Sequence, residues 1–149
     1  MNSKNKPKVI FICSHNSARS QIAEAFLRNY ANNHFEVYSA GLESTRINRY
    51  TIKVMEELNY DLSEQYSKAL SDFIGHVHFG IMITVCDQAD EKCPTMPGIG
   101  TRLHWSFEDP SSYEGTEEEK LEFFRKVRDD IKTKILEWLK EREIEPKNL

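Results

Sequence analysis

Hydrophobic and polar positions follow two periodicities that alternate along the chain. Short apolar runs rich in β-branched residues predict four strands, and apolar residues spaced three and four apart predict three helices. The predicted strands cover residues 8–12, 35–39, 79–85 and 102–107, and the predicted helices cover 19–32, 48–58 and 116–142. Strands that alternate with helices are typical of a parallel sheet with right-handed crossovers. The pattern therefore predicts a doubly wound α/β fold with the strand order 2-1-3-4.

Capping residues support two of the predicted helix starts. Asn48 can accept a hydrogen bond at the start of the second helix, and Thr116 followed by Glu119 resembles a capping box. The residues expected to face inward are Ile52, Val54 and Met55 in the second helix and Phe124, Val127, Ile131, Ile135 and Trp138 in the last helix. The acidic segment 86–100, which contains Pro and Gly, predicts a mobile loop with one helical turn. The pattern predicts neither a helix nor a strand in the polar segment 59–68.

Composition and charge exclude several classes of protein. The chain has 149 residues and a net charge of −4, and it lacks a basic patch of the kind that binds nucleic acid. No apolar run approaches the roughly 20 residues of a membrane span, and the start has no signal-peptide core. We therefore expect one monomeric domain, residues 1–149, in the cytosol. A chain of this length can bury a core without disulfides, so its three cysteines need another explanation.

The first candidate site is the turn between the first predicted strand and the first predicted helix. This turn consists of Cys13, Ser14, His15, Asn16, Ser17, Ala18, Arg19 and Ser20. Free backbone N–H groups and the helix dipole favour an anion there, and the Arg19 guanidinium can contact two oxygens of a tetrahedral oxyanion. The same environment should stabilise Cys13 as a thiolate nucleophile, with Ser20 as a further donor. Asn16 tolerates the positive φ that a tight cradle requires.

The alternative is a buried structural cysteine beside a solvated arginine, since a cysteine and an arginine six positions apart are a weak pattern by themselves. The predicted topology favours the anion site. Cys13 ends the first strand, Cys86 follows the third and Asp109 follows the fourth. The carboxyl ends of parallel strands meet at one rim of the sheet, so these three reactive side chains should converge there. We expect His15 to be an exposed loop residue.

The segment CSHNSARS after an apolar strand resembles the signature loop of the low-molecular-weight protein tyrosine phosphatases. It also resembles the loop of the thioredoxin-coupled arsenate reductases that share their fold. The segments YSAG at 38–41, HWSFEDP at 104–110 and GTEEEK at 115–120 resemble the reductase group in the same order. The resemblance covers nearly the whole chain and implies a three-layer α/β sandwich around a four-stranded parallel sheet. It also implies that Asp109 is a general acid, which would protonate the leaving oxygen of arsenate.

Cys86 and Cys93 favour the reductases over the phosphatases. A phosphatase lets water cleave the thiophosphate on Cys13, whereas a reductase needs further thiols for the two electrons. The resemblance implies that Cys13 binds arsenate, Cys86 attacks Cys13 and releases arsenite, and Cys93 then attacks Cys86. Because two cysteines bridge only when their Cα atoms lie within about 7 Å, the segment between Cys86 and Cys93 must unwind or shift. Thioredoxin would reduce the exposed Cys86–Cys93 disulfide.

A tyrosine phosphatase that acts through a phosphocysteine on Cys13 is the main alternative. Phosphatases of this kind often place an aromatic residue directly after the Asp-Pro pair, whereas Ser111 and Ser112 follow it here. A metal site could combine Cys86, Cys93 and His104, or use the histidine pair at 76 and 78, but the spacing is not that of a zinc knuckle. Three thiols at one rim could also sense arsenite, although the chain shows no signalling or DNA-binding element.

Two positions depart from the resemblance. Ala18 stands where some members have a further cysteine, so no disulfide can form within the loop. Some members bind a potassium ion near the loop, and Asn16, Glu24 and Ser39 match three of its side-chain ligands. Lys68 stands where the remaining carboxylate ligand would be, and its ammonium could repel or replace the ion. We therefore expect no cofactor, unless potassium binds despite Lys68.

Overall fold

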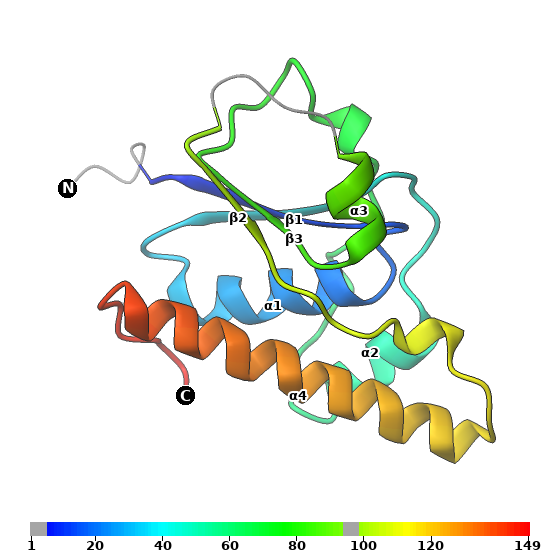
Figure 1. The fold of residues 1–149 in the computed structure, drawn as a ribbon. Helices are drawn as coiled ribbons and strands as arrows, with labels where there is room; N and C mark the ends of the chain where they lie inside the picture. Colours follow the sequence, from blue (N-terminus) through cyan, green and yellow to red (C-terminus); the bar gives the residue numbers. More distant parts are fainter. Residues whose placement is uncertain (1–5, 94–98) are drawn as a thin grey trace.

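The computed structural model describes residues 6–93 and 99–149 and has three layers, with a parallel sheet in the middle (Figure 1). The sheet has four strands in the order β2-β1-β3-β4. The strands are β1 (Lys8–Cys13), β2 (Glu36–Gly41), β3 (Ile81–Thr84) and β4 (Thr101–His104). The predicted fold class and strand order are confirmed. Strands β1 and β3 are neighbours, with Ile12 opposite Thr84, so the segments that follow them start side by side.

Helices cover both faces of the sheet. The helices are α1 (Arg19–Ala31), α2 (Arg49–Glu56), α3 (Asp87–Lys92) and α4 (Glu117–Glu141), with short 3₁₀ turns at Leu70–Asp72 and Pro110–Ser112. Figure 1 shows α1, α2 and α4 on one side of the sheet and α3 on the other. Among the described residues, no helix combines the length and the apolar character needed to cross a membrane.

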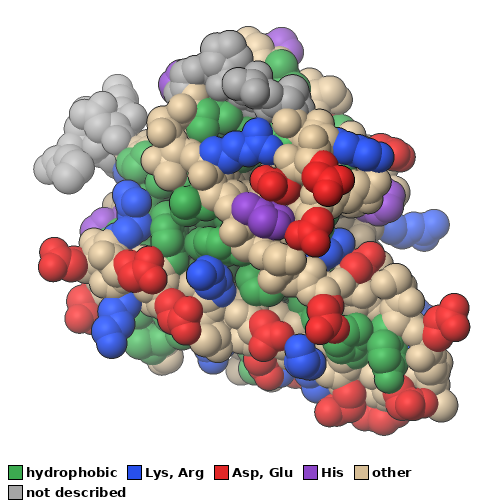
Figure 2. Space-filling model, viewed as in Figure 1, with side chains coloured by type: hydrophobic (Ala, Val, Ile, Leu, Met, Phe, Trp, Pro, Cys, Tyr) green, Lys and Arg blue, Asp and Glu red, His purple; other side chains and the backbone are tan. Residues whose placement is uncertain are grey.

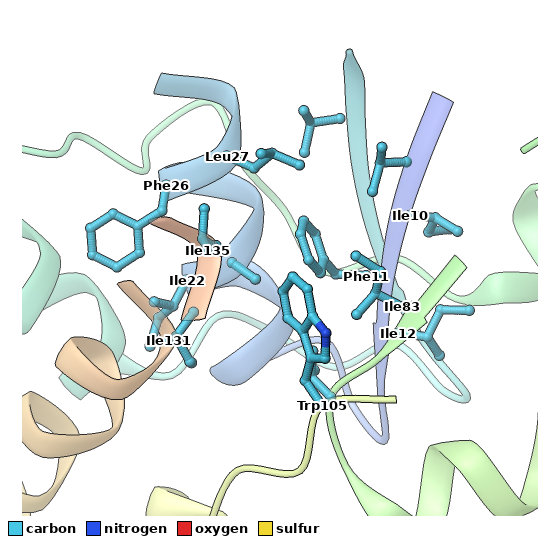
Figure 3. Close-up of a cluster of buried hydrophobic side chains, with 14 of the residues drawn as sticks. Ile10, Phe11, Ile12, Ile22, Phe26, Leu27, Ile83, Trp105, Ile131 and Ile135 are labelled. Atoms are coloured by element: carbon cyan, nitrogen blue, oxygen red, sulfur yellow. The ribbon is translucent and has the colours of Figure 1, made fainter. Parts of the chain in front are cut away.

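The core lies on both faces of β1. Phe11 points toward the side of α1 and α4, whereas Ile10 and Ile12 point to the opposite face (Figure 3), and all three are fully buried. Trp105 fills the space between sheet and helices, with its ring 6.0 Å from that of Phe11 and 5.8 Å from that of Trp138. The five α4 residues that were expected to face inward are all buried, as predicted.

The helix starts are capped as the sequence predicted. The Asn48 side chain accepts a hydrogen bond of 2.8 Å from the N–H of Tyr50. Thr116 Oγ1 accepts from the N–H of Glu119, and the Glu119 carboxylate accepts from the N–H of Thr116. Acidic side chains gather over this end of α4 in Figure 2, where they face the positive end of the helix dipole.

The first helix is buried more completely than the sequence predicted. An amphipathic helix was expected, but Gln21 and Glu24, on its polar side, are also buried. The cause is the segment 59–68, which the periodicity left unassigned and which packs against α1. Gln65 donates a hydrogen bond of 2.7 Å to the Gln21 side chain, and Lys68 pairs with Glu24. Polar residues therefore meet between α1 and this segment.

Two further expectations are wrong, and a third is confirmed in part. Ile52 is 36% exposed, because α2 buries Val54 and Met55 and turns Ile52 outward. The fourth strand ends at His104, since the chain then leaves the sheet so that Trp105 can enter the core. The segment from residue 86 contains the expected helical part, which is longer than one turn, because it forms α3 and buries Ala89. The prolines and glycine at 94, 97 and 98 lie outside the described residues.

Gly41 ends β2 where the chain passes the loop after β1. A Cβ at this position would lie 2.7 Å from the backbone nitrogen of Asn16. We predict that Gly41→Ala displaces this loop and lowers the free energy of unfolding by about 1–3 kcal/mol, as overpacking does, when measured by urea denaturation. Gly80→Ala is the control, because its Cβ would meet nothing nearer than the Pro7 Cβ at 3.7 Å. Equal losses in the two variants would show that the close approach at Gly41 is unimportant.

Candidate active site

The backbone of the loop after β1 leaves several N–H groups free. The carbonyl oxygens of Ser14, His15 and Ser17 accept hydrogen bonds from residues outside the loop. By contrast, the N–H groups of His15, Ser17 and Ala18 find no acceptor among the described residues. Helix α1 follows without a capping side chain and without an acidic residue in its first turn. Free N–H groups at a helix start form an anion site, so the loop is suited to a tetrahedral oxyanion.

Asn16 has φ +54°, which confirms the predicted left-handed conformation in the loop after β1. Its side chain is fully buried, and its N–H donates to the Cys13 sulfur across 3.2 Å. His15 is exposed, as predicted. With this backbone conformation the Asn16 N–H faces Cys13, while the side chain of His15 stays in solvent.

Cys13 is 3% exposed at the end of β1. The Oγ atom of Ser20, in the first turn of α1, lies 2.7 Å from the Cys13 sulfur. Together with the N–H of Asn16, this hydroxyl gives the sulfur two polar neighbours. Hydrogen bonds to sulfur favour its thiolate, which is the nucleophilic form.

Arg19 connects the loop to the segment after β4. Its side chain is almost buried, and its guanidinium donates a hydrogen bond of 3.1 Å to the carbonyl oxygen of Phe107. The same guanidinium lies 3.7 Å from Asp109 Oδ2. The other oxygen, Asp109 Oδ1, accepts hydrogen bonds from the N–H and hydroxyl of Ser111 at 3.0 and 2.6 Å. One carboxylate oxygen is thus held by Ser111, and the other faces Arg19.

Cys86 lies beside the loop at the start of α3. Its sulfur accepts a hydrogen bond of 3.3 Å from the N–H of Ala89 and caps the helix. The same sulfur lies 3.5 Å from the hydroxyl of Ser14. The structure therefore brings Cys13, Arg19, Cys86 and Asp109 to one rim of the sheet. The capping role of Cys86 had no signal in the sequence, because cysteine is not among the preferred capping residues.

Cys93 does not join this group. It ends α3 at the opposite end from Cys86, 7% exposed, and its thiol donates to the Met82 sulfur across 3.5 Å. Burial raises the pKa of this thiol above its usual range. Seven residue steps along a helix separate the Cα atoms of Cys86 and Cys93 by roughly 10 Å, whereas a disulfide needs about 7 Å or less. The two cysteines cannot bridge while α3 is formed.

Polar contacts hold α3 against β3 and β4. Asp90 Oδ1 accepts a hydrogen bond of 3.0 Å from Thr84, and Arg102 donates to the Asp90 carbonyl oxygen across 2.7 Å. Asp87 Oδ1 lies 2.9 Å from His104 Nε2. This contact, helped by the hydroxyl of Ser106, lowers the pKa of Asp87. These contacts tie both ends of α3 to the sheet.

Comparison with known proteins assigns the chain to a family. Residues 8–148 match the family model described as low molecular weight phosphotyrosine protein phosphatase. The chain is 42% identical over 131 residues to an arsenate reductase of Bacillus licheniformis, which covers 88% of this chain and 94% of that protein. The chain belongs to the arsenate reductases with this phosphatase fold. The expected family is confirmed.

Solved structures of arsenate reductases have the same fold. One, described as an arsenate reductase in the phosphate binding state, superimposes with a TM-score of 0.73 at 30% identity over 91% of this chain and 98% of that chain. A thioredoxin-dependent arsenate reductase of Corynebacterium glutamicum superimposes with a TM-score of 0.67 at 30% identity. That match covers 91% of this chain and 60% of the Corynebacterium chain.

The metal site considered from the sequence has no support in this member of the arsenate reductase family. His104 contacts Thr84 and Asp87 through its two ring nitrogens, so it is not directed at Cys86 or Cys93. Within the described residues, no three potential metal ligands are grouped. All three cysteines are free thiols.

Burial of Cys93 predicts a distinct pH dependence for its alkylation. Only the thiolate reacts, so the rate for Cys93 in the folded, reduced protein should rise at higher pH than the value of about 8.5 for a free cysteine. Below that pH the neutral thiol stabilises the folded state, and this contribution is lost as the pH rises through the raised pKa. Iodoacetamide labelling with peptide mass spectrometry measures the rate, and the protein in urea is the control. The same pH profile in both states would contradict the raised pKa.

Proposed function

We propose that this protein reduces arsenate to arsenite by a thiol relay in which Cys13, Cys86 and Cys93 react in turn. The observation that carries the proposal is the position of Cys86. Its sulfur lies beside the anion loop and at the same time caps the helix that leads to Cys93. A phosphatase that uses water has no need of either feature.

The first step uses the loop and its two charged neighbours. The free N–H groups and Arg19 hold the arsenate oxygens, and the Cys13 thiolate attacks arsenic to form an S–As bond. One arsenate oxygen leaves, and Asp109 supplies the proton that lets it depart as water. Ser111 orients one oxygen of Asp109 and the other faces Arg19, so the carboxyl group lies beside the loop, within reach of the leaving oxygen. Arsenic is still in its +5 state after this step.

In the next step two thiols reduce arsenic, and in the step after it the disulfide is passed on to Cys86 and Cys93. The Cys86 thiolate attacks the Cys13 sulfur, a Cys13–Cys86 disulfide forms, and the S–As bonding pair leaves with arsenic as arsenite. The Cys93 thiolate then attacks Cys86, which releases Cys13 and leaves a Cys86–Cys93 disulfide. Because α3 separates these two cysteines, it must unwind before the second exchange. The opened segment would present the disulfide to a reductant.

Thioredoxin is the proposed reductant of the Cys86–Cys93 disulfide. The Corynebacterium relative is described as thioredoxin-dependent, which supports a dithiol protein as the donor. We place the reaction in the cytosol, where thiols stay reduced between turnovers. The protein is proposed to act as a monomer, without nucleic acid or membrane.

The test couples the protein to thioredoxin, thioredoxin reductase and NADPH and follows NADPH loss after arsenate is added. The wild type should consume NADPH in proportion to arsenate. Cys93→Ser should lose steady-state turnover while still forming at most one arsenite per protein, because its first two steps remain possible. Arsenite formed in a single turnover distinguishes this result from misfolding.

Two outcomes would overturn the proposal. Full steady-state turnover of Cys93→Ser would exclude the third thiol from the reaction. Rapid hydrolysis of aryl phosphates by the wild type, without arsenate-dependent NADPH loss, would instead assign the phosphatase reaction to Cys13.

A further inference from the structure

A buried ion pair, Glu24 and Lys68, lies behind the anion loop. Glu24 is 3% exposed, and its Oε1 lies 3.1 Å from the Lys68 ammonium, which is also buried. Its Oε2 lies 2.6 Å from the Arg28 guanidinium. Removing two charges from water is unfavourable, so a buried ion pair is weak support for a purely stabilising role. The role of these charges therefore depends on the residues that they contact.

A chain of hydrogen bonds leads from Glu24 to the loop, and its direction is fixed. An ionised carboxylate can only accept, so the hydroxyl of Ser39 donates to Glu24 Oε1. Ser39 Oγ in turn accepts from Asn16 Nδ2 across 3.0 Å. The second hydrogen of Asn16 Nδ2 goes to Ser20 Oγ at 2.7 Å. Each hydrogen in this chain of hydrogen bonds thus has one acceptor assigned to it.

The orientation of the Asn16 amide is fixed independently. Its Oδ1 accepts hydrogen bonds of 2.8 Å from Gln21 Nε2 and from the backbone N–H of Lys68. Two N–H groups on one side of the amide identify that atom as oxygen, so Nδ2 must face Ser20 and Ser39. Lys68 therefore contacts the chain twice, through its backbone at Asn16 and through its ammonium at Glu24.

This chain of hydrogen bonds ends on the sulfur of Cys13, the proposed nucleophile. Because Ser20 Oγ accepts from Asn16, its own hydrogen is available for the Cys13 sulfur, 2.7 Å away. The sulfur is then the acceptor, as a thiolate is. The ionised Glu24 carboxylate sets the direction at Ser39, the far end of this chain of hydrogen bonds, and the Lys68 ammonium is the cation that pairs with the same oxygen that accepts from Ser39.

A potassium ion does not fit the same place. The three side chains that match the family's ligands already use their oxygens as acceptors. Asn16 Oδ1 accepts two N–H groups, Ser39 Oγ accepts from Asn16, and Glu24 Oε1 accepts from Ser39 and Lys68. The ammonium also lies over the ring of Tyr66, 4.9 Å from its centre. We propose that Lys68 is a positioning residue whose ammonium replaces the monovalent cation, holds Glu24 at the far end of the hydrogen bonds that lead to Ser20, and makes the reactivity of Cys13 independent of potassium.

This inference rests on Cys13 as the nucleophile of the proposed function and not on the later steps of the relay. Its test therefore measures the reaction of Cys13 alone. The rate of Cys13 alkylation by iodoacetamide is measured against pH for the folded, reduced protein by peptide mass spectrometry. Buffers of equal ionic strength contain either potassium chloride or tetramethylammonium chloride, whose cation is too large for the site.

The wild type should give the same rates in both salts. Lys68→Met keeps a side chain of similar length without the charge. In this variant Cys13 should react about tenfold more slowly at pH 7, and its rate profile should move to higher pH. The reason is that a hydrogen bond to the charged sulfur is weakened. Lys68→Arg should recover most of the rate. Lys126→Met is the matched control, since Lys126 is an exposed lysine of α4 paired with Asp130, and its profile should equal that of the wild type.

A variant with the opposite charge at position 68 gives the most direct test. Lys68→Asp places a second carboxylate beside Glu24, so Cys13 should react slowly in tetramethylammonium and regain at least part of its rate in potassium. The open groove of about 600 Å³ that Glu24, Tyr66 and Lys68 border gives the ion access from solvent.

Two results would overturn the inference. One is a wild-type rate that rises with potassium, a measurement that needs no variant to fold. The other is a Cys13 profile in Lys68→Met that equals the wild type, with native circular dichroism. Loss of arsenate-dependent NADPH consumption with an unchanged alkylation result would reject the relay and leave the role of Lys68 intact.

Discussion

The length of α3 is the constraint on which the proposed chemistry depends. As long as this helix is formed, Cys86 stays beside the anion loop while Cys93 stays buried against Met82. The separation protects the last thiol, because a buried neutral thiol is a poor nucleophile. It also prevents the Cys86–Cys93 disulfide from forming before Cys13 has reacted.

Local energetics make the opening of α3 feasible. A helix of six residues is not stable by itself, so α3 depends on its contacts with the sheet and on its cap. That cap is the sulfur of Cys86, the atom that attacks Cys13 in the proposed second step. Once this sulfur belongs to a disulfide it is a weaker acceptor, so the reaction itself removes part of what holds the helix closed. Short segments can open locally with free energies below that of global unfolding.

The sequence predicted the parts of the site that depend on local pattern and topology. An apolar strand followed by a turn and a helix located Cys13 and Arg19, and the positive φ of Asn16 followed from its residue type. The strand order placed Asp109 and Cys86 at the same rim. These features were accessible because strand ends and helix starts have characteristic residues, and because parallel strands share one carboxyl edge.

Other parts could not be predicted because they depend on segments without periodicity. The helical spacing places Glu24 on the polar side of α1, and only the family resemblance indicated that it lies near the loop. The irregular segment 59–68 buries it under Lys68. Cys86 gives no sign of being a cap, since cysteine rarely caps helices. Ile52 follows the spacing of Met55 but is exposed, because only the packed fold decides which side of a short helix is covered.

Hydrogen exchange within α3 tests the central claim most directly. Cys93→Ser treated with one equivalent of arsenate should stop at the Cys13–Cys86 disulfide, which peptide mapping verifies. Backbone amides of residues 89–93 should then exchange at least about tenfold faster than in the same variant before arsenate, because the helix has lost its cap. Equal exchange in the two states, with the disulfide present, would contradict the account, since α3 would then have no reason to release Cys93.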